Sequence, residues 1–268
     1  MMQADGTAQG SVGDLIAAAF DAGLRERYPC VVALDETGST NDMAFEMGRL
    51  GMPDGTVVVA NRQTSGRGRM DRAWASAPGG LYLSILRRMR EGEERASAVG
   101  LLAGMALRDA VEAASGVSAR LKWPNDLLVG SRKLAGILVE GSGGWQVVGM
   151  GLNLNQRSSD LPADLRPAAV TLFDLAGRSF DLPAVAAEVL ARFAAFEALF
   201  LESGKVPTAL YEQHLWGLGN PVRVLLGDRT LDGVVRGVDA DGALLLEGPQ
   251  GVQRVLSGEV VHVRAEGT

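Results

Sequence analysis

The residues best suited to chemistry lie in an arginine- and glycine-rich loop, residues 60–80 (ANRQTSGRGRMDRAWASAPGG), between two expected strands. Arginine offers a planar, permanently charged fork for phosphate or carboxylate, and glycine lets the backbone approach a ligand closely. The residues of these two types that we single out are Gly66, Arg67, Gly68, Arg69 and Arg72. Residues 62–90 hold seven arginines and one acid in a chain whose net charge is −6. This local charge predicts a focused anion site, although a solvated basic loop or an RNA-binding segment has the same composition.

Lysine is scarce in this chain, and its positions are therefore informative. Only three of the 26 basic residues are lysines, and two of them lie in one predicted β-hairpin, residues 121–141 (LKWPNDLLVGSRKLAGILVEG). Asn125 and Asp126 supply its first turn. A single lysine at a strand end commonly protects a sheet edge. Two lysines in one hairpin of a lysine-poor chain favour a functional role for Lys122 and Lys133.

Two further segments have both a structural and a ligand-binding interpretation. Ser39, Thr40 and Asn41 begin a helical pattern, and Ser39 with Asp42 fits a capping box, which is the interpretation that the sequence alone favours. The start of a helix also offers free N–H groups to a polar ligand. In residues 148–155 (VGMGLNLN), two glycines on one face of a buried strand either serve packing or leave room for a ligand.

Helical and strand patterns alternate in the first two thirds of the chain, which predicts a mixed α/β domain. We expect strands at residues 31–34, 56–60, 81–86, 121–123, 137–139 and 146–154. We expect helices at residues 15–24, 41–50, 96–114 and 182–201. Five short apolar runs with tight turns follow and predict a small β barrel, at residues 222–226, 231–238, 243–247, 252–256 and 260–263. We therefore expect two domains, residues 1–217 and residues 218–268.

Composition excludes several classes of protein. With 47% hydrophobic residues, the chain has the composition of a globular protein. One cysteine and two histidines, Cys30, His214 and His262, supply neither an intrachain disulfide nor a zinc cluster, and no hydrolase triad is evident. The sequence shows no membrane-spanning run and no signal-peptide pattern at its N-terminus. We expect a cytoplasmic protein that binds neither membranes nor nucleic acid.

Four motifs, in this order and spacing, resemble those of the biotin–protein ligases (biotin–acetyl-CoA-carboxylase ligases): STND, Gln63 with GRGR, KWPND with RKLAGILVE, and GMGLNLN. The resemblance covers residues 31–155, and the C-terminal barrel agrees with the SH3-like domain of that family. It implies a mixed α/β catalytic domain related to class II synthetases and lipoate ligases. The implied reaction has two steps, in which biotin and Mg-ATP first give biotinyl-5′-adenylate and pyrophosphate. A lysine of the biotin carboxyl carrier protein of acetyl-CoA carboxylase then takes the biotinyl group.

The resemblance also assigns residues to each ligand. It implies that biotin contacts Ser39, Thr40, Asn41, Gln63, Gly66, Arg67, Gly68, Arg69, Lys133 and Gly136. It implies that ATP contacts Arg67, Arg69, Arg72, Trp74, Lys122, Asn125, Lys133 and Asn153. Asp126 is the expected Mg²⁺ ligand, and Lys133 and Arg69 are the expected catalytic residues.

The physical chemistry of the implied reaction agrees with these assignments. The carboxylate of biotin must approach an anionic α-phosphate, so cations have to neutralise both groups. The chain needs no nucleophile of its own, because the lysine of the carrier attacks the activated ester. Its few cysteines and histidines are therefore no obstacle.

One feature departs from the family pattern, and a second limits the function that the resemblance implies. Met70 and Asp71 follow GRGR where the family usually has a basic residue and glycine, which questions phosphate contacts beyond Arg69. The 30 residues before Val31 are too few for a helix-turn-helix domain, which predicts a ligase without a repressor function. A lipoate or octanoate ligase and a non-catalytic sensor of biotinyl-adenylate are the alternatives. The sequence leaves open whether the protein is a homodimer.

Overall fold

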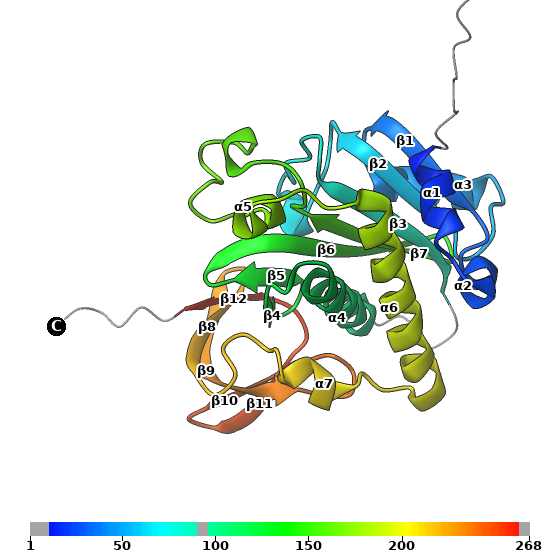
Figure 1. The fold of residues 1–268 in the computed structure, drawn as a ribbon. Helices are drawn as coiled ribbons and strands as arrows, with labels where there is room; N and C mark the ends of the chain where they lie inside the picture. The colour runs from blue at the N-terminus through cyan, green and yellow to red at the C-terminus, as the bar shows by residue number, and fades with distance from the viewer. Residues whose placement is uncertain (1–10, 90–95, 263–268) are drawn as a thin grey trace, which may run out of the picture.

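The computed structural model describes residues 11–89 and 96–262, and its larger part is a mixed seven-stranded sheet (Figure 1). The strands, in spatial order, are β1 (Val31–Thr37), β2 (Val57–Gln63), β3 (Leu81–Arg88), β7 (Trp145–Leu152), β6 (Arg132–Ser142), β5 (Asp126–Val129) and β4 (Arg120–Lys122). β1 and β2 are parallel, and the other neighbouring pairs of this sheet are antiparallel. The mixed α/β architecture expected from the sequence is confirmed.

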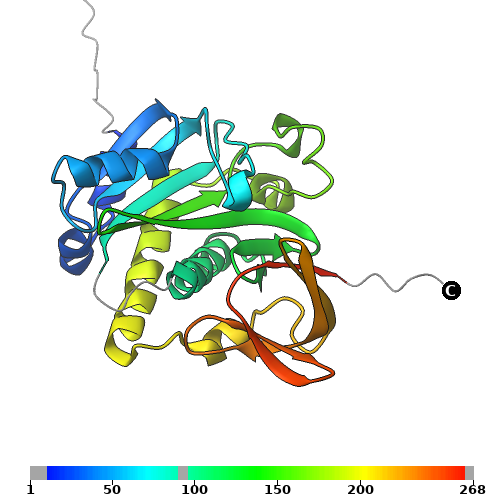
Figure 2. The ribbon, with the colours of Figure 1, turned by 180° about the vertical axis from the view of Figure 1, so that it is seen from behind.

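Helices cover both faces of this sheet. They are α1 (Val12–Ala18), α2 (Ala22–Arg27), α3 (Thr40–Arg49), α4 (Ala96–Ser115), α5 (Leu172–Ala176), α6 (Leu182–Ser203) and α7 (Thr208–Glu212), with 3₁₀ turns at Arg69–Asp71 and Ser158–Asp160. α4 and α6 pack around the main core on one face, and α3 packs on the other face against a smaller cluster that includes Trp145 (Figure 2). In the described part of the chain, no helix is both long and apolar enough to cross a membrane.

The C-terminal residues form a separate antiparallel sheet of five strands. In spatial order they are β11 (Gly251–Val255), β10 (Leu244–Gly248), β9 (Arg229–Val238), β8 (Pro221–Leu226) and β12 (Glu259–His262). This sheet lies beside β4 and β5 of the larger sheet (Figure 1). The indole N–H of Trp123 donates to the carbonyl oxygen of Gly242 at 3.0 Å, which joins the two sheets. The turn before β10 is therefore in direct contact with the residue that follows β4.

Most of the expected elements are present, and the differences have local causes. The single helix expected at residues 15–24 is wrong, because Asp21 begins a second helix there by accepting from the N–H of Leu24 at 2.8 Å. The strand expected to end at residue 154 ends at Leu152. The last residue of the strand expected at 260–263 lies outside the described residues. The short helices α5 and α7 have too few residues to give a periodic pattern, and we did not expect them.

Candidate active site

A cavity of about 520 Å³ lies between the larger sheet and the edge of the C-terminal sheet. Its walls come from the start of α3, the arginine loop (residues 66–74), the β4–β5 turn, β6, β7, residues 161–169 and residues 258–261. The cavity brings together most of the predicted site residues, namely Ser39, Thr40, Asn41, Gln63, Arg67, Gly68, Arg69, Arg72, Trp74, Lys122, Asn125, Asp126, Lys133, Gly136 and Asn153. Gly66 is predicted to belong to the site but does not line the cavity.

The arginine loop is a short hairpin. It closes through an antiparallel bridge between Arg67 and Ala73. At its tip, Met70 and Asp71 both have a φ of 55°, in the left-handed region. The turn leaves Asp71 exposed, and Arg72 beyond it lines the cavity. The departure from the family pattern at Met70 and Asp71 therefore turns the chain without removing Arg72 from the site.

Gly66 shapes this hairpin from outside the cavity. A Cβ at Gly66 would lie 2.6 Å from Ser76 Oγ and 2.7 Å from the carbonyl oxygen of Trp74, so the returning chain leaves no room for a side chain. The ligand contact implied for Gly66 stays a prediction.

Hydroxyl and amide groups line one end of the cavity, here called the polar end. The N–H and the hydroxyl oxygen of Thr40 lie 2.8 and 3.0 Å from Gln63 Oε1, and Gln63 Nε2 donates to Ser76 Oγ at 2.9 Å. Behind them, the buried Oγ of Ser84 lies 2.7 Å from Thr40 Oγ1 and 2.6 Å from Asn41 Oδ1. Neutral donors and acceptors of this kind suit a polar, uncharged part of a ligand.

The capping box expected from Ser39 and Asp42 is wrong. Ser39 occupies the N-cap position of α3, but its side chain makes no capping hydrogen bond. The carboxylate of Asp42 instead accepts two hydrogen bonds from Arg67, at 2.6 and 2.8 Å. A bidentate, charge-assisted pair is stronger than a local capping bond, and it holds Asp42 toward the arginine loop. The first residues of α3 are thus free to face the cavity.

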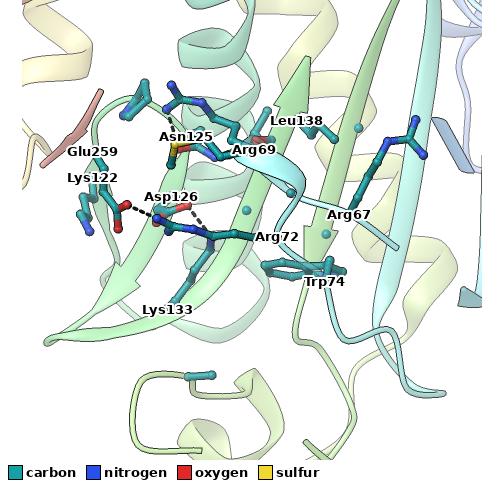
Figure 3. Close-up of a pocket in the computed structure, with 18 of the residues that line it drawn as sticks. Arg67, Arg69, Arg72, Trp74, Lys122, Asn125, Asp126, Lys133, Leu138 and Glu259 are labelled. Atoms are coloured by element: carbon teal, nitrogen blue, oxygen red, sulfur yellow. Dashed lines mark hydrogen bonds and ion pairs between the residues drawn. The ribbon is translucent and has the colours of Figure 1, made fainter. Parts of the chain in front are cut away.

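Arg67 forms hydrogen bonds with two carboxylates. Besides its pair with Asp42, it donates from Nε and Nη2 to Glu140 at 3.2 and 3.1 Å. The hydrogen bonds to Asp42 and, secondarily, to Glu140 raise the pKa of Arg67. Figure 3 shows Arg67 on the side of the cavity away from Glu259 and the other labelled cations. Its side chain therefore belongs to the polar end.

Glycines of β6 and β7 form the floor between the two ends. A Cβ at Gly151 would lie 2.6 Å from Trp74 Nε1, and one at Gly136 would lie 2.9 Å from the Trp74 ring. A Cβ at Gly149 would lie 2.3 Å from Asn41 Oδ1. These glycines let the two side chains lie close against the sheet. Trp74 Nε1 is buried and has no hydrogen-bond partner among the described residues, so it can donate to a ligand.

The opposite end of the cavity, here called the cationic end, gathers four cations and two carboxylates (Figure 3). Lys133 Nζ lies 2.6 Å from Asp126 Oδ1 and 5.2 Å from the centroid of a Trp74 ring. Arg72 pairs with Glu259 of the C-terminal sheet, and this hydrogen bond lowers the pKa of Glu259. The remaining cations are Arg69 and Lys122.

Arg69 and Lys122 form no hydrogen bond or ion pair with a carboxylate among the residues that the structure describes. Arg69 Nη1 donates to the carbonyl oxygen of Gly258 at 3.0 Å and to Asn125 Oδ1 at 3.4 Å. Lys122 Nζ lies 5.9 Å from the centroid of a Trp216 ring. Burial lowers the pKa of Arg69, because the guanidinium loses hydration there. Their charges are therefore available to an anionic ligand.

Two predicted site residues hold the walls of the cavity in place. Asn125 Nδ2 donates to the carbonyl oxygen of Ile137 at 3.0 Å, which ties the β4–β5 turn to β6. Asn153 Nδ2 donates to the carbonyl oxygen of Val170 at 3.1 Å, and its Oδ1 accepts from Gln156 at 3.1 Å. Both asparagines line the cavity, and the nucleotide contacts implied for them stay predictions.

The two carboxylates of the cationic end are the candidate ligands of the expected Mg²⁺ ion. Within residues 11–89 and 96–262, no group of three or more His, Cys, Asp or Glu side chains could hold a metal ion. Mg²⁺ is usually bound by one or two carboxylates together with substrate phosphates. Asp126 and Glu259 both line the cavity, so an ion that enters with a phosphate chain fits this end. The role of Asp126 stays a prediction.

Several residues of the site carry no local signal in the sequence. Glu140 ends the RKLAGILVE segment and Ser84 lies within an apolar strand, so each is an ordinary strand residue by pattern. Glu259 and Trp216 come from the C-terminal part of the chain. A lone polar residue in a buried strand is the only signal that could have drawn attention to Ser84, because a buried hydroxyl requires a hydrogen-bond partner.

Comparison with known protein families gives the class of this enzyme. Residues 34–155 match the Biotin/lipoate A/B protein ligase family, and residues 217–263 match the Biotin protein ligase C terminal domain. The fold and the cavity, with one polar and one cationic end, thus belong to the class of biotin and lipoate ligases.

Individual relatives narrow this class. A biotin–[acetyl-CoA-carboxylase] ligase of Mycobacterium tuberculosis is 35% identical over 250 residues, which cover 91% of this chain and 92% of the relative. A bifunctional ligase/repressor BirA of Bacillus subtilis is 33% identical over 84% of this chain and 72% of its own length. The structure of a biotin protein ligase from Aquifex aeolicus in complex with biotin and ATP is 32% identical, with a TM-score of 0.78 over 87% of this chain and 97% of that one. The chain belongs to the biotin protein ligase family.

Proposed function

We propose that this protein uses ATP to ligate biotin to a lysine of a biotin carboxyl carrier protein, as a biotin–[acetyl-CoA-carboxylase] ligase. The observation that carries this function is the joining of a polar end and a cationic end in one cavity. Biotin has a polar, uncharged ring system at one end and a carboxylate at the other. The match to a ligase that binds both biotin and ATP supports the same pair of substrates.

In this proposal the polar end holds the ring system of biotin. Thr40, Asn41 and Gln63 present hydroxyl and amide groups, and Trp74 lies against the floor glycines beside them. The biotin side chain then runs along this floor toward Lys133. This direction brings the carboxylate to the cationic end.

The first step joins two anions and therefore depends on the cations. A carboxylate oxygen of biotin attacks the α-phosphorus of ATP, the bond to the bridging oxygen breaks, and pyrophosphate leaves with the electron pair. In this proposal Lys133 and Arg69, which both lie at the cationic end, neutralise the carboxylate and the charge that develops on the phosphoryl oxygens. Arg72 and Lys122 hold the remaining phosphates in the same proposal. Asp126 would hold an Mg²⁺ ion that accompanies ATP, and the ion would supply further positive charge beside the phosphates.

The second step needs no nucleophile from the chain. The neutral amine of the carrier lysine attacks the biotinyl carbonyl carbon, an amide bond forms, and AMP leaves. The acceptor that we propose is the carrier domain of acetyl-CoA carboxylase or of a related carboxylase. We place the reaction in the cytoplasm.

One assay tests this function against its alternatives. Purified protein is incubated with Mg-ATP, a carrier domain and either biotin or lipoate, and both the adenylate and the modified carrier are measured. We expect biotinyl-adenylate and a biotinylated carrier. Transfer of lipoate but not of biotin would assign the protein to the lipoate ligases, and adenylate formation without transfer would identify a sensor.

A further inference from the structure

Glu140 contacts both the polar end and the arginine loop. Its Oε2 lies 2.6 Å from Asn41 Nδ2 and 3.1 Å from Arg67 Nη2, while its Oε1 lies 3.2 Å from Arg67 Nε. Among the described contacts, this one carboxylate therefore joins the start of α3 on one side with the arginine loop on the other. The side chain of Glu140 is 28% exposed, so these hydrogen bonds are partly shielded from water.

The carboxylate is the nearer of two acceptors that determine which way the amide of Asn41 points; the other is the carbonyl oxygen of Leu138, 3.4 Å from Asn41 Nδ2. A carboxylate only accepts hydrogen bonds, so the atom of Asn41 that faces it at 2.6 Å must be the donating Nδ2. Asn41 Oδ1 then faces Ser84 Oγ at 2.6 Å and must accept the single proton of that hydroxyl. The side chain packs closely against β7 at Gly149, where a Cβ would lie 2.3 Å from Oδ1.

The direction of these hydrogen bonds also determines where the hydroxyl of Thr40 donates its proton. Because the proton of Ser84 is used by Asn41, the hydroxyl of Thr40 must donate toward Ser84 Oγ or Gln63 Oε1, which lie at 2.7 and 3.0 Å. The lone pairs of Thr40 Oγ1 then remain for a donor on the ligand. A cyclic urea presents N–H donors, and an acceptor of fixed direction is what it requires.

We infer that Glu140 is a positioning residue for the ligase reaction. It sets the hydrogen-bond direction of the polar end through Asn41, Ser84 and Thr40, and it holds the arginine loop closed through Arg67. Asp42 shares only the second task, since its carboxylate binds Arg67 at 2.6 and 2.8 Å and takes no part in the hydrogen bonds between Asn41, Ser84 and Thr40 given above. This inference rests on the proposed function.

Two single substitutions separate the two tasks. In Glu140→Gln the new amide can donate to Asn41, so only the longer contact of 3.4 Å with the carbonyl oxygen of Leu138 still orients Asn41, and we expect the KM for biotin to rise by about 10-fold or more. The KM for ATP should change by less than about twofold, because the cationic end is unaltered. In Asp42→Asn the KM for biotin should change little. Both variants should release biotinyl-adenylate faster when no carrier is present, since each loosens the hold on Arg67.

A double substitution tests whether the effect of Glu140 reaches Thr40 through Asn41 and Ser84. In a Ser84→Ala background the hydroxyl that transmits the direction is missing, so Glu140→Gln should add much less to the KM for biotin than it does alone. Glu36→Gln is the matched control, because Glu36 forms a similar ion pair with Arg62 at 2.9 Å on the exposed ends of β1 and β2. This control should behave as wild type in every measurement.

The possible results have separate meanings. Wild-type protein that makes no biotinyl-adenylate would overturn the proposed function. Active wild type together with a Glu140→Gln variant of unchanged biotin KM and unchanged adenylate release would overturn only the role of Glu140. Equal increases in the KM for biotin and for ATP would also overturn it, because they indicate a general structural effect. If Glu140→Gln does not fold, unchanged adenylate release in Asp42→Asn would contradict the proposed hold on the loop.

Discussion

At the scale of single residues, the arginines of the cavity differ in their hydrogen-bond partners. Arg67 has two carboxylates within hydrogen-bond distance, whereas Arg69 donates to neutral oxygens. An arginine that is already paired contributes mainly position, and one with neutral partners contributes charge to a ligand. Arg67 and Arg69, the two arginines of the GRGR segment, therefore differ in how much of their charge is left for a ligand.

Lys133 gives the most direct test at this scale. Replacing it by alanine should reduce the formation of biotinyl-adenylate by on the order of 100-fold or more, because a cation is removed from the place where charge develops. The rate of pyrophosphate release with biotin and Mg-ATP measures this effect, and circular dichroism checks the fold. Lys205→Ala, at an exposed lysine outside the cavity, is the control and should retain the full rate. An undiminished rate in Lys133→Ala would show that the role assigned to Lys133 is wrong.

The glycine floor gives a second test. A methyl group at Gly151 would lie 2.6 Å from Trp74 Nε1, so the ring has to move out of its place against β7. We expect Gly151→Ala to raise the KM for biotin by about 10-fold. Gly100→Ala is the matched control, because its Cβ would make only an ordinary contact of 3.7 Å with Val139. Steady-state kinetics that leave the Gly151 variant unchanged would contradict the proposed biotin position.

At the scale of elements, a buried ionic contact attaches α6 to β3 behind the site. Glu197 of α6 accepts from Arg87 of β3 at 2.6 Å and from Arg27 of α2 at 2.7 Å. Only 3% of Glu197 and 4% of Arg87 is exposed, so water cannot replace these partners. The contact holds the long helix against β3, from which Ser84 supports the polar end.

Removing this carboxylate should destabilise the whole domain. Because Arg27 and Arg87 lose the carboxylate that they share, we expect Glu197→Ala to lower the free energy of unfolding by about 3–5 kcal/mol. Urea denaturation measures the change. Glu188→Ala removes a similar pair, with Arg192 at 2.7 Å, from the exposed surface of the same helix and should cost no more than about 1 kcal/mol. Equal losses in the two variants would argue against a special role for burial.

At the scale of the whole molecule, the C-terminal sheet completes the cavity. Its Gly258 carbonyl oxygen accepts from Arg69, and its Glu259 carboxylate accepts from Arg72. Both arginines belong to the arginine loop of the larger sheet. The two sheets therefore share the cationic end, and a change in their relative position would alter the part of the site that we propose binds phosphate.

This contact should depend on pH. The hydrogen bond from Arg72 lowers the pKa of Glu259 below its ordinary value of 4.5, so the folded state favours the charged carboxylate. The resulting stability is fully present above pH 4.5 and is lost as the pH falls through the lowered pKa. The difference in the free energy of unfolding between wild type and Glu259→Gln should be at most about 1 kcal/mol at neutral pH and should shrink in acid. A difference that grows as the pH falls would contradict this assignment.

The sequence was sufficient for much of the fold and for part of the site. Buried strands such as β3 appear as continuous apolar runs, and the C-terminal strands are separated by tight-turn residues, so both patterns are local. The motifs that contain Thr40, Arg69 and Lys133 are local as well. Prediction failed where a second local feature competed with the helical pattern. At Asp21 the side chain caps a new helix, so the single expected helix is divided in two.

The sequence by itself therefore determined which segments line the cavity, because each motif is a short run of residues. Only the tertiary structure decided which charges meet. Glu140 lies 73 residues from Arg67 and Glu259 lies 187 residues from Arg72, yet each pair is in contact. The order of the strands, β1-β2-β3-β7-β6-β5-β4, and the place of the second sheet bring them together. Such contacts depend on packing between distant segments, and no local pattern of residues encodes them.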